Sequence, residues 1–335
     1  MLTSSDFITI PYTPDMTQAG IAYACKSLHF TYNRMGTSPV KRLQRIVAGV
    51  AVELAFRRLL AAKQIPHDNL GATPFTDPDR YDIAIGGRRC DIKSFLLTHK
   101  ERISQVRQQP ANLLEAQALV PLDQIKADRG TDDDIFIFAF LNALLTPNQA
   151  TLKKALAAEQ PVYLIYTLPK HWARPQAWQP LGALTLKSNA SQLLKIELNG
   201  QDPMRSPQKE QFILRPGKRV TARKTFFALN SLHSPQHADG QIGIHSPVLN
   251  ETRVIQPLDW GNIWVYGMEI NFCGYMPRGE FRQKAETLPA GSRVFQYPRT
   301  RTPNLSLPMK ALYPLSELFQ QAKVWKNSTI GMKKL

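Results

Sequence analysis

The sequence predicts an α/β domain with a mixed central sheet flanked by helices, followed by a second domain that is mainly β and basic. Two stretches of helical periodicity come first, then a hairpin pattern centred on a glycine pair, a weaker helical pattern and an apolar run suited to a buried strand. This order is typical of a mixed sheet covered by helices. We place the boundary near residue 165, which gives domains 1–165 and 166–335.

The first two helices are expected over residues 16–35 and 40–63, where apolar residues recur at three- and four-residue steps without internal proline. Gly36 and Pro39 separate them, because both residue types interrupt helices. Residues 65–79 turn to Pro, Asn, Gly, Thr and Asp, a composition typical of a loop.

Residues 81–97 predict two strands joined by Gly86-Gly87, since a glycine pair between apolar segments favours a two-residue hairpin turn. A weaker helical pattern covers 111–128, and apolar runs at 135–140 and 162–168 predict buried strands. Beyond them, proline and short β-type segments indicate the mainly β domain.

The chain carries 42 basic and 26 acidic residues, a formal net charge of +16. Residues 1–167 hold 19 basic and 16 acidic side chains, whereas 168–335 hold 23 and 10, so the excess is mostly C-terminal. A field of this sign attracts polyanions. We expect nucleic acid as the partner and no membrane association, because there is no long basic amphipathic helix and the longest apolar run is too short to span a bilayer.

The cysteines also bear on the compartment. Cys25, Cys90 and Cys273 are far apart and odd in number, which argues against a disulfide framework and against a structural zinc site. The N-terminus has no basic segment followed by an apolar core, as a signal peptide would. We therefore expect a cytoplasmic protein.

The predicted hairpin brings charged residues together. With Gly86 and Gly87 at the centre of the turn, Asp82 faces Asp91 as a non-hydrogen-bonded pair, with Cα atoms about 4.5 Å apart. The strand period of two puts Lys93 on the same face. Two opposed carboxylates destabilise a sheet unless they are compensated, and one lysine supplies only one positive charge. A divalent cation would complete the neutralisation, and magnesium prefers such oxygen ligands.

A metal beside a lysine suits phosphodiester hydrolysis, because the metal activates water and both charges stabilise the developing negative charge. Glu53 is a third candidate. It falls near the apolar stripe of Ile46, Val50 and Leu60 on the second expected helix, where an ionised glutamate needs a partner. The alternative for all these charges is a surface hairpin with ordinary ion pairs worth less than about 1 kcal/mol each.

These residues resemble the PD-(D/E)XK nuclease superfamily, which places a glutamate on a helix before the sheet, an aspartate on one strand and an acidic-x-lysine triplet on the next. Glu53 is similar to the glutamate, Asp82 to the aspartate and Asp91-Ile92-Lys93 to the triplet, over roughly residues 40–145. The resemblance implies a restriction-endonuclease-like sheet. It also implies that Asp82, Asp91 and the Ile92 carbonyl bind Mg²⁺, with Mn²⁺ as a substitute, that Glu53 contributes directly or through water, and that Lys93 positions the attacking water.

By the same resemblance the chain would be an endonuclease that cuts double-stranded DNA and leaves 5′-phosphate ends. A type II restriction-type enzyme, acting as a homodimer like many members, is the leading interpretation. A repair or anti-phage nuclease that recognises DNA structure or modification is one alternative, and a catalytically inactive nucleic-acid-binding protein is another. The literal Pro-Asp dipeptide falls at Pro78-Asp79, so Asp79 remains an alternative to Asp82.

Two basic segments of the C-terminal half contain aromatic residues, a combination that suits contacts to phosphates and bases. The first ends in Phe226-Phe227, and the second surrounds Phe295 and Tyr297. Such charge runs are otherwise solvated faces, and we expect DNA contact from at least one of the two. Their candidate contact residues are Arg215, Lys218, Arg219, Arg223, Lys224, Arg299 and Arg301.

Overall fold

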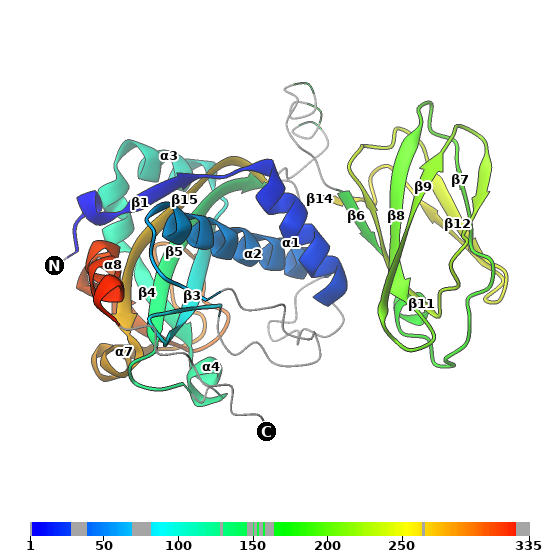
Figure 1. Ribbon diagram of the computed structural model, residues 1–335. Helices are drawn as coiled ribbons and strands as arrows, with labels where there is room; N and C mark the ends of the chain where they lie inside the picture. The colour runs from blue at the N-terminus through cyan, green and yellow to red at the C-terminus, as the bar shows by residue number, and fades with distance from the viewer. Residues whose placement is uncertain are drawn as a thin grey trace.

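The computed structural model describes residues 2–27, 39–68, 82–127, 130–145, 150, 153, 157, 164–262 and 265–325 (Figure 1). The described chain is a mixed α/β protein with several sheets, as the sequence predicts at that level. None of its described helices is both long and apolar enough to cross a membrane.

The first sheet has five strands in the order β1-β15-β5-β3-β2. Their bounds are Ile8–Pro11 for β1, Val265–Pro277 for β15, Ile135–Leu145 for β5, Arg88–Leu97 for β3 and Ile83–Ile85 for β2. β3 and β5 are parallel, with Asp91 beside Phe136, and the other neighbours are antiparallel. The sheet is therefore mixed, and the expected strand at 135–140 is its central strand β5.

Two helices cover one face of this sheet, where they lie in front of it in Figure 1: α1 (Pro14–Ser27) and α2 (Pro39–Ala62). They correspond to the two helices expected from periodicity. α2 packs Val52 and Phe56 into a core that also contains Ile137 and Phe272 of the sheet. The Phe56 and Phe272 rings lie 5.2 Å apart.

The other face of the sheet carries a phenylalanine-rich core. Phe136, Phe138 and Phe140 of β5 point into it, together with Phe95 of β3 and Phe281. The chain segments that close it are α3 (Lys100–Gln108), η2 (Pro110–Glu115), α7 (Arg278–Lys284), η3 (Met309–Ala311) and a small sheet of β4 (Gln117–Pro121), β17 (Asn304–Pro308) and β16 (Glu286–Leu288).

The expected helix over 111–128 is wrong. A 3-10 turn, the strand β4 and the short helix α4 (Leu122–Ala127) occupy it instead. β4 is a strand because it pairs with β17, with Leu119 opposite Ser306. A partner so distant in the sequence overrides the weak local preference.

Residues 164–262 form a separate β-sandwich, shown on the right of Figure 1. One sheet has the order β14-β6-β11-β8-β9 and the other β10-β7-β12-β13. The strand bounds are β6 Leu164–Thr167, β7 Thr185–Ser188, β8 Leu194–Gln201, β9 Pro207–Leu214, β10 Arg219–Thr221, β11 Ala228–Ser234, β12 Ile242–Ser246, β13 Glu251–Ile255 and β14 Gly261–Asn262.

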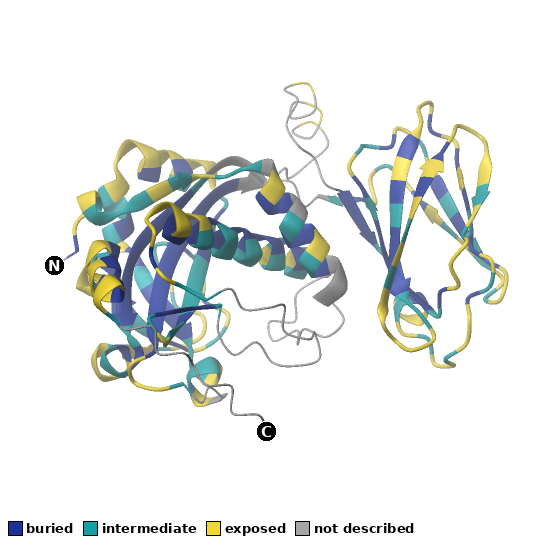
Figure 2. Ribbon diagram, in the orientation of Figure 1, coloured by how far each residue is buried: buried dark blue, intermediate teal, exposed yellow. Residues whose placement is uncertain are grey.

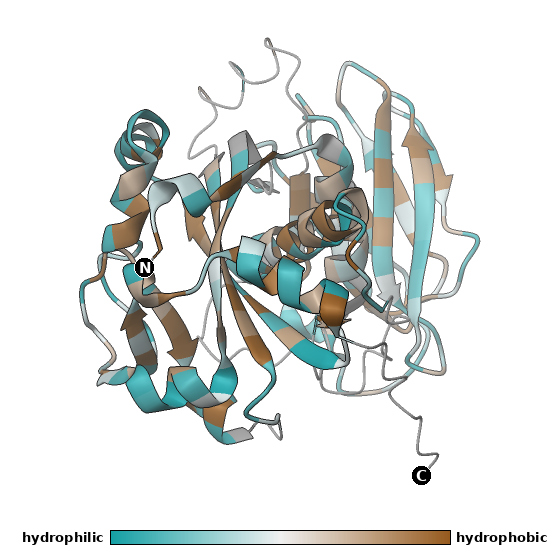
Figure 3. Ribbon diagram, turned by 60° about the vertical axis from the view of Figure 1, so that its left-hand side comes forward, coloured by the Kyte–Doolittle hydropathy of each residue, from teal (hydrophilic) through white to brown (hydrophobic). Residues whose placement is uncertain are grey.

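The sandwich has its own apolar core, because alternate residues of its strands point between the two sheets. Leu194, Ile196 and Leu198 of β8 are buried, whereas Lys195 between them is exposed. Figures 2 and 3 show this alternation of burial and hydropathy along the sandwich strands. Trp172, on the short helix α6 (Lys170–Ala173), is fully buried in the same core.

After the sandwich the chain returns to the first sheet. β15 pairs with both β1 and β5, and α8 (Leu315–Val324) packs on the α2 side of that sheet. The short helix η1 (Ser4–Asp6) precedes β1. The unit with its own core is therefore residues 164–262 and not 166–335. The boundary expected at 165 marks where an insertion starts, because an apolar pattern identifies a strand but not its pairing partner.

Candidate active site

The β2–β3 hairpin forms as predicted. Ile83 pairs with Cys90, Ala84 with Arg89 and Ile85 with Arg88. Gly86 and Gly87 have φ angles of 57° and 79°, the positive values that a two-residue hairpin turn requires at both central positions. The turn thus fixes which residues of β3 face which residues of the preceding segment.

Trp325, at the end of α8, packs over this turn. The Arg88 guanidinium lies 4.1 Å from the centre of the Trp325 ring, and a Cβ atom on Gly86 would overlap that ring.

We expect Gly86→Ala to lower the free energy of unfolding. A left-handed backbone conformation alone costs an alanine about 1–2 kcal/mol, and the overlap with Trp325 should make the loss larger than that. Gly217→Ala is the matched control, because Gly217 has φ 68° and a Cβ atom added there would meet no neighbour within 4 Å. Equal losses in urea unfolding for the two variants would show that Trp325 does not constrain the turn.

Asp82 directly precedes β2 and turns toward the edge of β3. Its amide donates to the Cys90 carbonyl at 3.1 Å, and its carboxylate accepts the Ile92 amide at 2.6 Å. The side chain therefore binds the backbone between Asp91 and Lys93 instead of standing as a regular cross-strand pair with Asp91. The expected cross-strand pair of Asp82 and Asp91 is therefore not part of the β2–β3 ladder, which ends at the pair of Ile83 and Cys90.

Asp91 and Lys93 lie on the same face of β3, as predicted. The Lys93 ammonium is 2.5 Å from an Asp91 carboxylate oxygen and 3.0 Å from the side-chain oxygen of Gln124 on α4. It also lies 5.7 Å from the centre of the Phe136 ring. The Lys93 side chain is 12% exposed and that of Asp91 is 34% exposed, so the lysine is held in a niche while the carboxylate remains accessible to solvent.

Gln124 is a site residue that the sequence did not reveal. It reaches Lys93 because β4 is a strand and α4 begins directly after it, an arrangement that depends on the pairing of β4 with β17. An ammonium group has three protons to donate. Asp91 and Gln124 accept two, which leaves one for a water molecule or a phosphate oxygen.

Glu53 lies on α2, partly buried, one helical turn before Arg57. Arg57 donates to the Asp82 carbonyl at 3.0 Å, so this part of α2 passes the start of β2. Among the described residues, no three acidic, histidine or cysteine side chains lie close enough together to form a metal-binding group. Glu53 therefore does not complete a three-carboxylate cluster with Asp82 and Asp91 in this arrangement. Asp79 lies outside the described residues.

The remaining donors fit magnesium as a two-carboxylate site. Asp91 directly precedes Ile92 in β3, and the Ile92 amide points toward the Asp82 carboxylate. The N–H and C=O of one strand residue point to the same edge. The Ile92 carbonyl thus faces Asp82 as well. Magnesium commonly uses one or two carboxylates and completes its shell with water and substrate phosphates.

The buried cysteines take no part in this chemistry. Cys90 and Cys273 are completely buried, and burial raises the pKa of both thiols far above the usual range. Both stay protonated at neutral pH, and a thiol is a poor nucleophile compared with a thiolate.

The first predicted DNA-contact segment lies on the sandwich, where β9 and β10 are the edge strands of the two sheets. We call this surface the basic edge. Its five predicted members are all exposed: Arg215, Lys218, Arg219, Arg223 and Lys224. The acidic neighbour Glu210 is engaged in hydrogen bonds to the backbone, since its two carboxylate oxygens accept the amides of Arg223 and Lys224 at 2.9 Å.

The second predicted segment belongs to the first body, so the two predicted segments are separate surfaces. Arg299 and Arg301 are exposed in the connection before β17. Arg45 of α2 lies near Arg301, and burial together with this like charge lowers the pKa of Arg45. Burial raises the pKa of the neighbouring Tyr297 to about 12.

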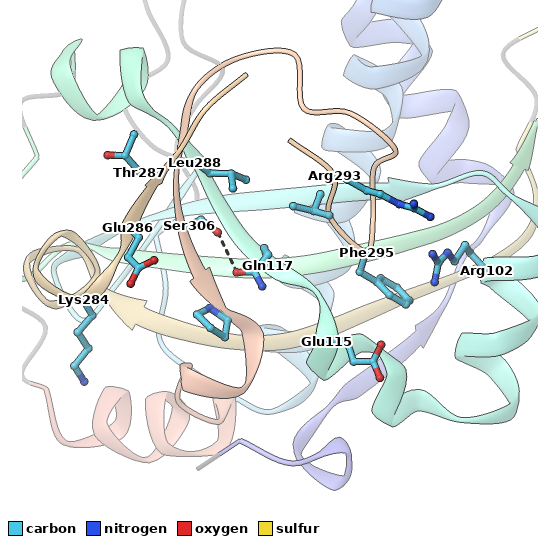
Figure 4. Close-up of a pocket in the computed structure, with 12 residues that line it drawn as sticks. Arg102, Glu115, Gln117, Lys284, Glu286, Thr287, Leu288, Arg293, Phe295 and Ser306 are labelled. Carbon is cyan, nitrogen blue, oxygen red and sulfur yellow. Dashed lines mark hydrogen bonds between the residues drawn. The ribbon is translucent and has the colours of Figure 1, made fainter. Parts of the chain in front are cut away.

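A pocket lies away from this site, beside β4, β16 and β17 (Figure 4). Its volume is about 650 Å³. Figure 4 shows acidic and basic side chains around it, including Glu115, Glu286 and Arg293. The Arg102 guanidinium lies 4.6 Å from the centre of the Phe295 ring. None of the predicted catalytic residues lines it.

Comparisons with known proteins add no assignment. A scan against protein-family models, a search of curated proteins and a search of solved structures each gave no match to this chain.

Proposed function

We propose that this protein is a magnesium-dependent endonuclease that hydrolyses phosphodiester bonds of double-stranded DNA, with a PD-(D/E)XK type of site on a restriction-endonuclease-like sheet. The observation that carries the proposal is the hydrogen bond from the Ile92 amide to the Asp82 carboxylate. It holds the Asp82 carboxylate at the backbone of β3, the strand on which Asp91 and Lys93 form an ion pair.

The order of elements around this site supports the same class. The helix α2 with Glu53 precedes the hairpin, and β3 continues through α3 and α4 into the parallel neighbour β5. Asp82, Asp91 and the Ile92 carbonyl would hold the magnesium ion, which when bound supplies Lewis-acid activation of water and neutralises phosphate charge.

The chain's own residues supply positioning. Asp91 and Gln124 fix the Lys93 ammonium, which leaves its third proton for the attacking water or a non-bridging phosphate oxygen. A fixed positive charge at this place stabilises the negative charge that develops on the phosphate. Arg57 holds the Asp82 backbone and thereby sets the position of its carboxylate.

The sandwich gives this nuclease a separate surface for reading DNA, which fits a type II restriction-type enzyme. One site cuts one strand, so cleavage of both strands would use a homodimer. A nuclease that reads DNA structure or modification would use the same catalytic residues, and the pattern of products distinguishes the two.

The test is incubation of the purified protein with unmodified plasmid and phage DNA, with magnesium or with EDTA, beside the variants Asp91→Asn and Glu101→Gln. We expect discrete magnesium-dependent fragments with 5′-phosphate ends from the wild type and from Glu101→Gln, an exposed acidic control on α3. Asp91→Asn should be inactive. A smear would favour recognition of structure, whereas a mobility shift in EDTA with no cleavage of any DNA would replace the proposal with a binding protein.

If the basic edge contacts DNA phosphates, the affinity for DNA should depend on salt concentration. Each lysine or arginine that neutralises a phosphate contributes about 0.9 to the slope of log affinity against log salt concentration. The triple variant Arg215→Ala, Lys218→Ala, Arg219→Ala should therefore bind more weakly at low salt and show a slope reduced by about 0.9 per lost contact. The control removes the exposed residues Lys63, Lys310 and Lys323, which lie off the sandwich. An equal slope change in both triple variants would mean that only net charge matters.

A further inference from the structure

A second feature of the sandwich lies at the tip of the β8–β9 hairpin, residues 202–206. Met204 at this tip is 82% exposed, more than any other large hydrophobic residue in the described part of the chain. A single exposed methionine on a loose loop would mean little. The surroundings of this one distinguish it.

The tip is held by a closed set of hydrogen bonds. The Asp202 amide donates to the Ser206 carbonyl at 3.1 Å, and the Arg205 amide donates to the Asp202 carbonyl at 3.1 Å. The Asp202 carboxylate accepts the Ser206 amide at 2.8 Å, and the Gln201 side chain donates to the Arg205 carbonyl at 2.9 Å. Arg205 adopts a φ of 62°, which only a well-determined turn imposes on a residue other than glycine.

An aromatic stack braces the tip from one side. The Trp178 indole N–H donates to the Pro203 carbonyl at 2.8 Å, and the Trp178 ring lies 5.7 Å from that of Phe227. The Arg205 guanidinium covers the Trp178 ring at 4.4 Å from its centre. The arginine is thus already ordered, and less conformational entropy remains to be lost when it binds an anion.

The charge around the tip suits a polyanion. Residues 201–224 contain seven basic and two acidic residues. Both acids, Asp202 and Glu210, accept backbone amides within the sandwich. β9 runs eight residues from the tip toward Arg215, a length of about 26 Å at 3.3 Å per residue, which matches roughly eight base pairs of duplex DNA.

We propose that the β8–β9 tip is a wedge for duplex DNA: Met204 inserts at a base step from the minor groove, Arg205 contacts the adjacent phosphate, and the basic edge follows the backbone away from it. Proteins that bend DNA commonly insert an apolar side chain in this way and use neighbouring basic residues to hold the bent duplex. DNA is the ligand of the wedge, in line with the proposed function, but insertion of Met204 does not depend on DNA cleavage.

The experiment measures binding and base unstacking in EDTA, where cleavage plays no part. The probe is a set of 25-base-pair duplexes that carry 2-aminopurine at pyrimidine–purine steps, which are the flexible ones. The fluorescence of 2-aminopurine rises when this base leaves the stack. The variants are Met204→Ala, Arg205→Ala and, as matched control, Leu258→Ala, which removes a hydrophobic side chain that is 75% exposed between β13 and β14. Because Met204 is exposed, thermal unfolding should be the same for Met204→Ala as for the wild type.

We expect wild-type protein and Leu258→Ala to raise the 2-aminopurine fluorescence and Met204→Ala to abolish the rise. Affinity of Met204→Ala should fall about tenfold, as for the loss of one buried apolar side chain. Arg205→Ala should reduce the salt slope by about 0.9. Binding without any fluorescence rise, an unchanged rise with Met204→Ala, or no binding to DNA at all would each overturn the wedge. The first two outcomes leave the proposed nuclease intact, whereas a protein that binds in EDTA but never cleaves retains the wedge and loses the nuclease.

Discussion

Replacement of Lys93 by alanine should reduce the rate of DNA cleavage by about 10²–10³-fold, the usual cost of removing one preorganised group that stabilises transition-state charge. The Lys93 ammonium is fixed between Asp91 and Gln124 and keeps one proton for the reacting groups. DNA binding in EDTA should remain close to that of the wild type, because the basic edge is untouched. Single-turnover cleavage at saturating protein measures this rate directly.

Two further variants make that result interpretable. Lys93→Arg should not restore activity, since a planar guanidinium cannot replace a compact ammonium in a niche that leaves the lysine only 12% exposed. Lys100→Ala removes an exposed lysine from the start of α3, the element after β3, and should cleave normally. Cleavage by Lys93→Ala within a few-fold of the wild-type rate, with an unchanged melting temperature, would remove Lys93 from the catalytic machinery.

The hairpin that carries this lysine could be predicted because its determinants are local. Gly86 and Gly87 specify the turn, and a period of two then assigns the face of Asp91 and Lys93 without knowledge of the rest of the chain. Glu53 could be placed on a helix for a similar reason, because apolar residues recur there at three- and four-residue steps. This local reasoning has a limit. It could not foresee that the ladder ends at Ile83, which sends the Asp82 carboxylate to the Ile92 amide.

What the sequence could not indicate depends on contacts between distant segments. β15 becomes the neighbour of β5 only after the inserted sandwich of residues 164–262, and its apolar pattern would suit a strand of either body. Gln124 reaches Lys93 for a similar reason, since α4 follows a strand whose partner β17 lies near the C-terminal end. The division at 165 and the helix expected over 111–128 both failed because pairing across long sequence separations decides these segments.

The insertion itself leads to the second large effect, on stability. Phe138 is completely buried, with its ring 5.6 Å from that of Phe281 and 6.4 Å from that of Phe136. Phe226 is completely buried in the sandwich. Phe138→Ala should lower the free energy of unfolding of the first body by about 3–5 kcal/mol, and Phe226→Ala should do the same to the sandwich. Each variant should leave the unfolding transition of the other unit nearly unchanged, because the two phenylalanines lie in cores that share no residue.

Urea unfolding followed by tryptophan fluorescence can separate the two units, since Trp172 and Trp260 lie in the sandwich core and Trp325 packs on the first body. Leu258→Ala, an exposed hydrophobic substitution, controls for a general effect of side-chain truncation. If both phenylalanine variants shift one common transition, the sandwich and the first body unfold as a single cooperative unit. Ile165 of β6 shares an apolar cluster with Leu43 and Val47 of α2. This cluster would then be the coupling to disrupt first, because it joins the start of the sandwich to the helix that bears Glu53.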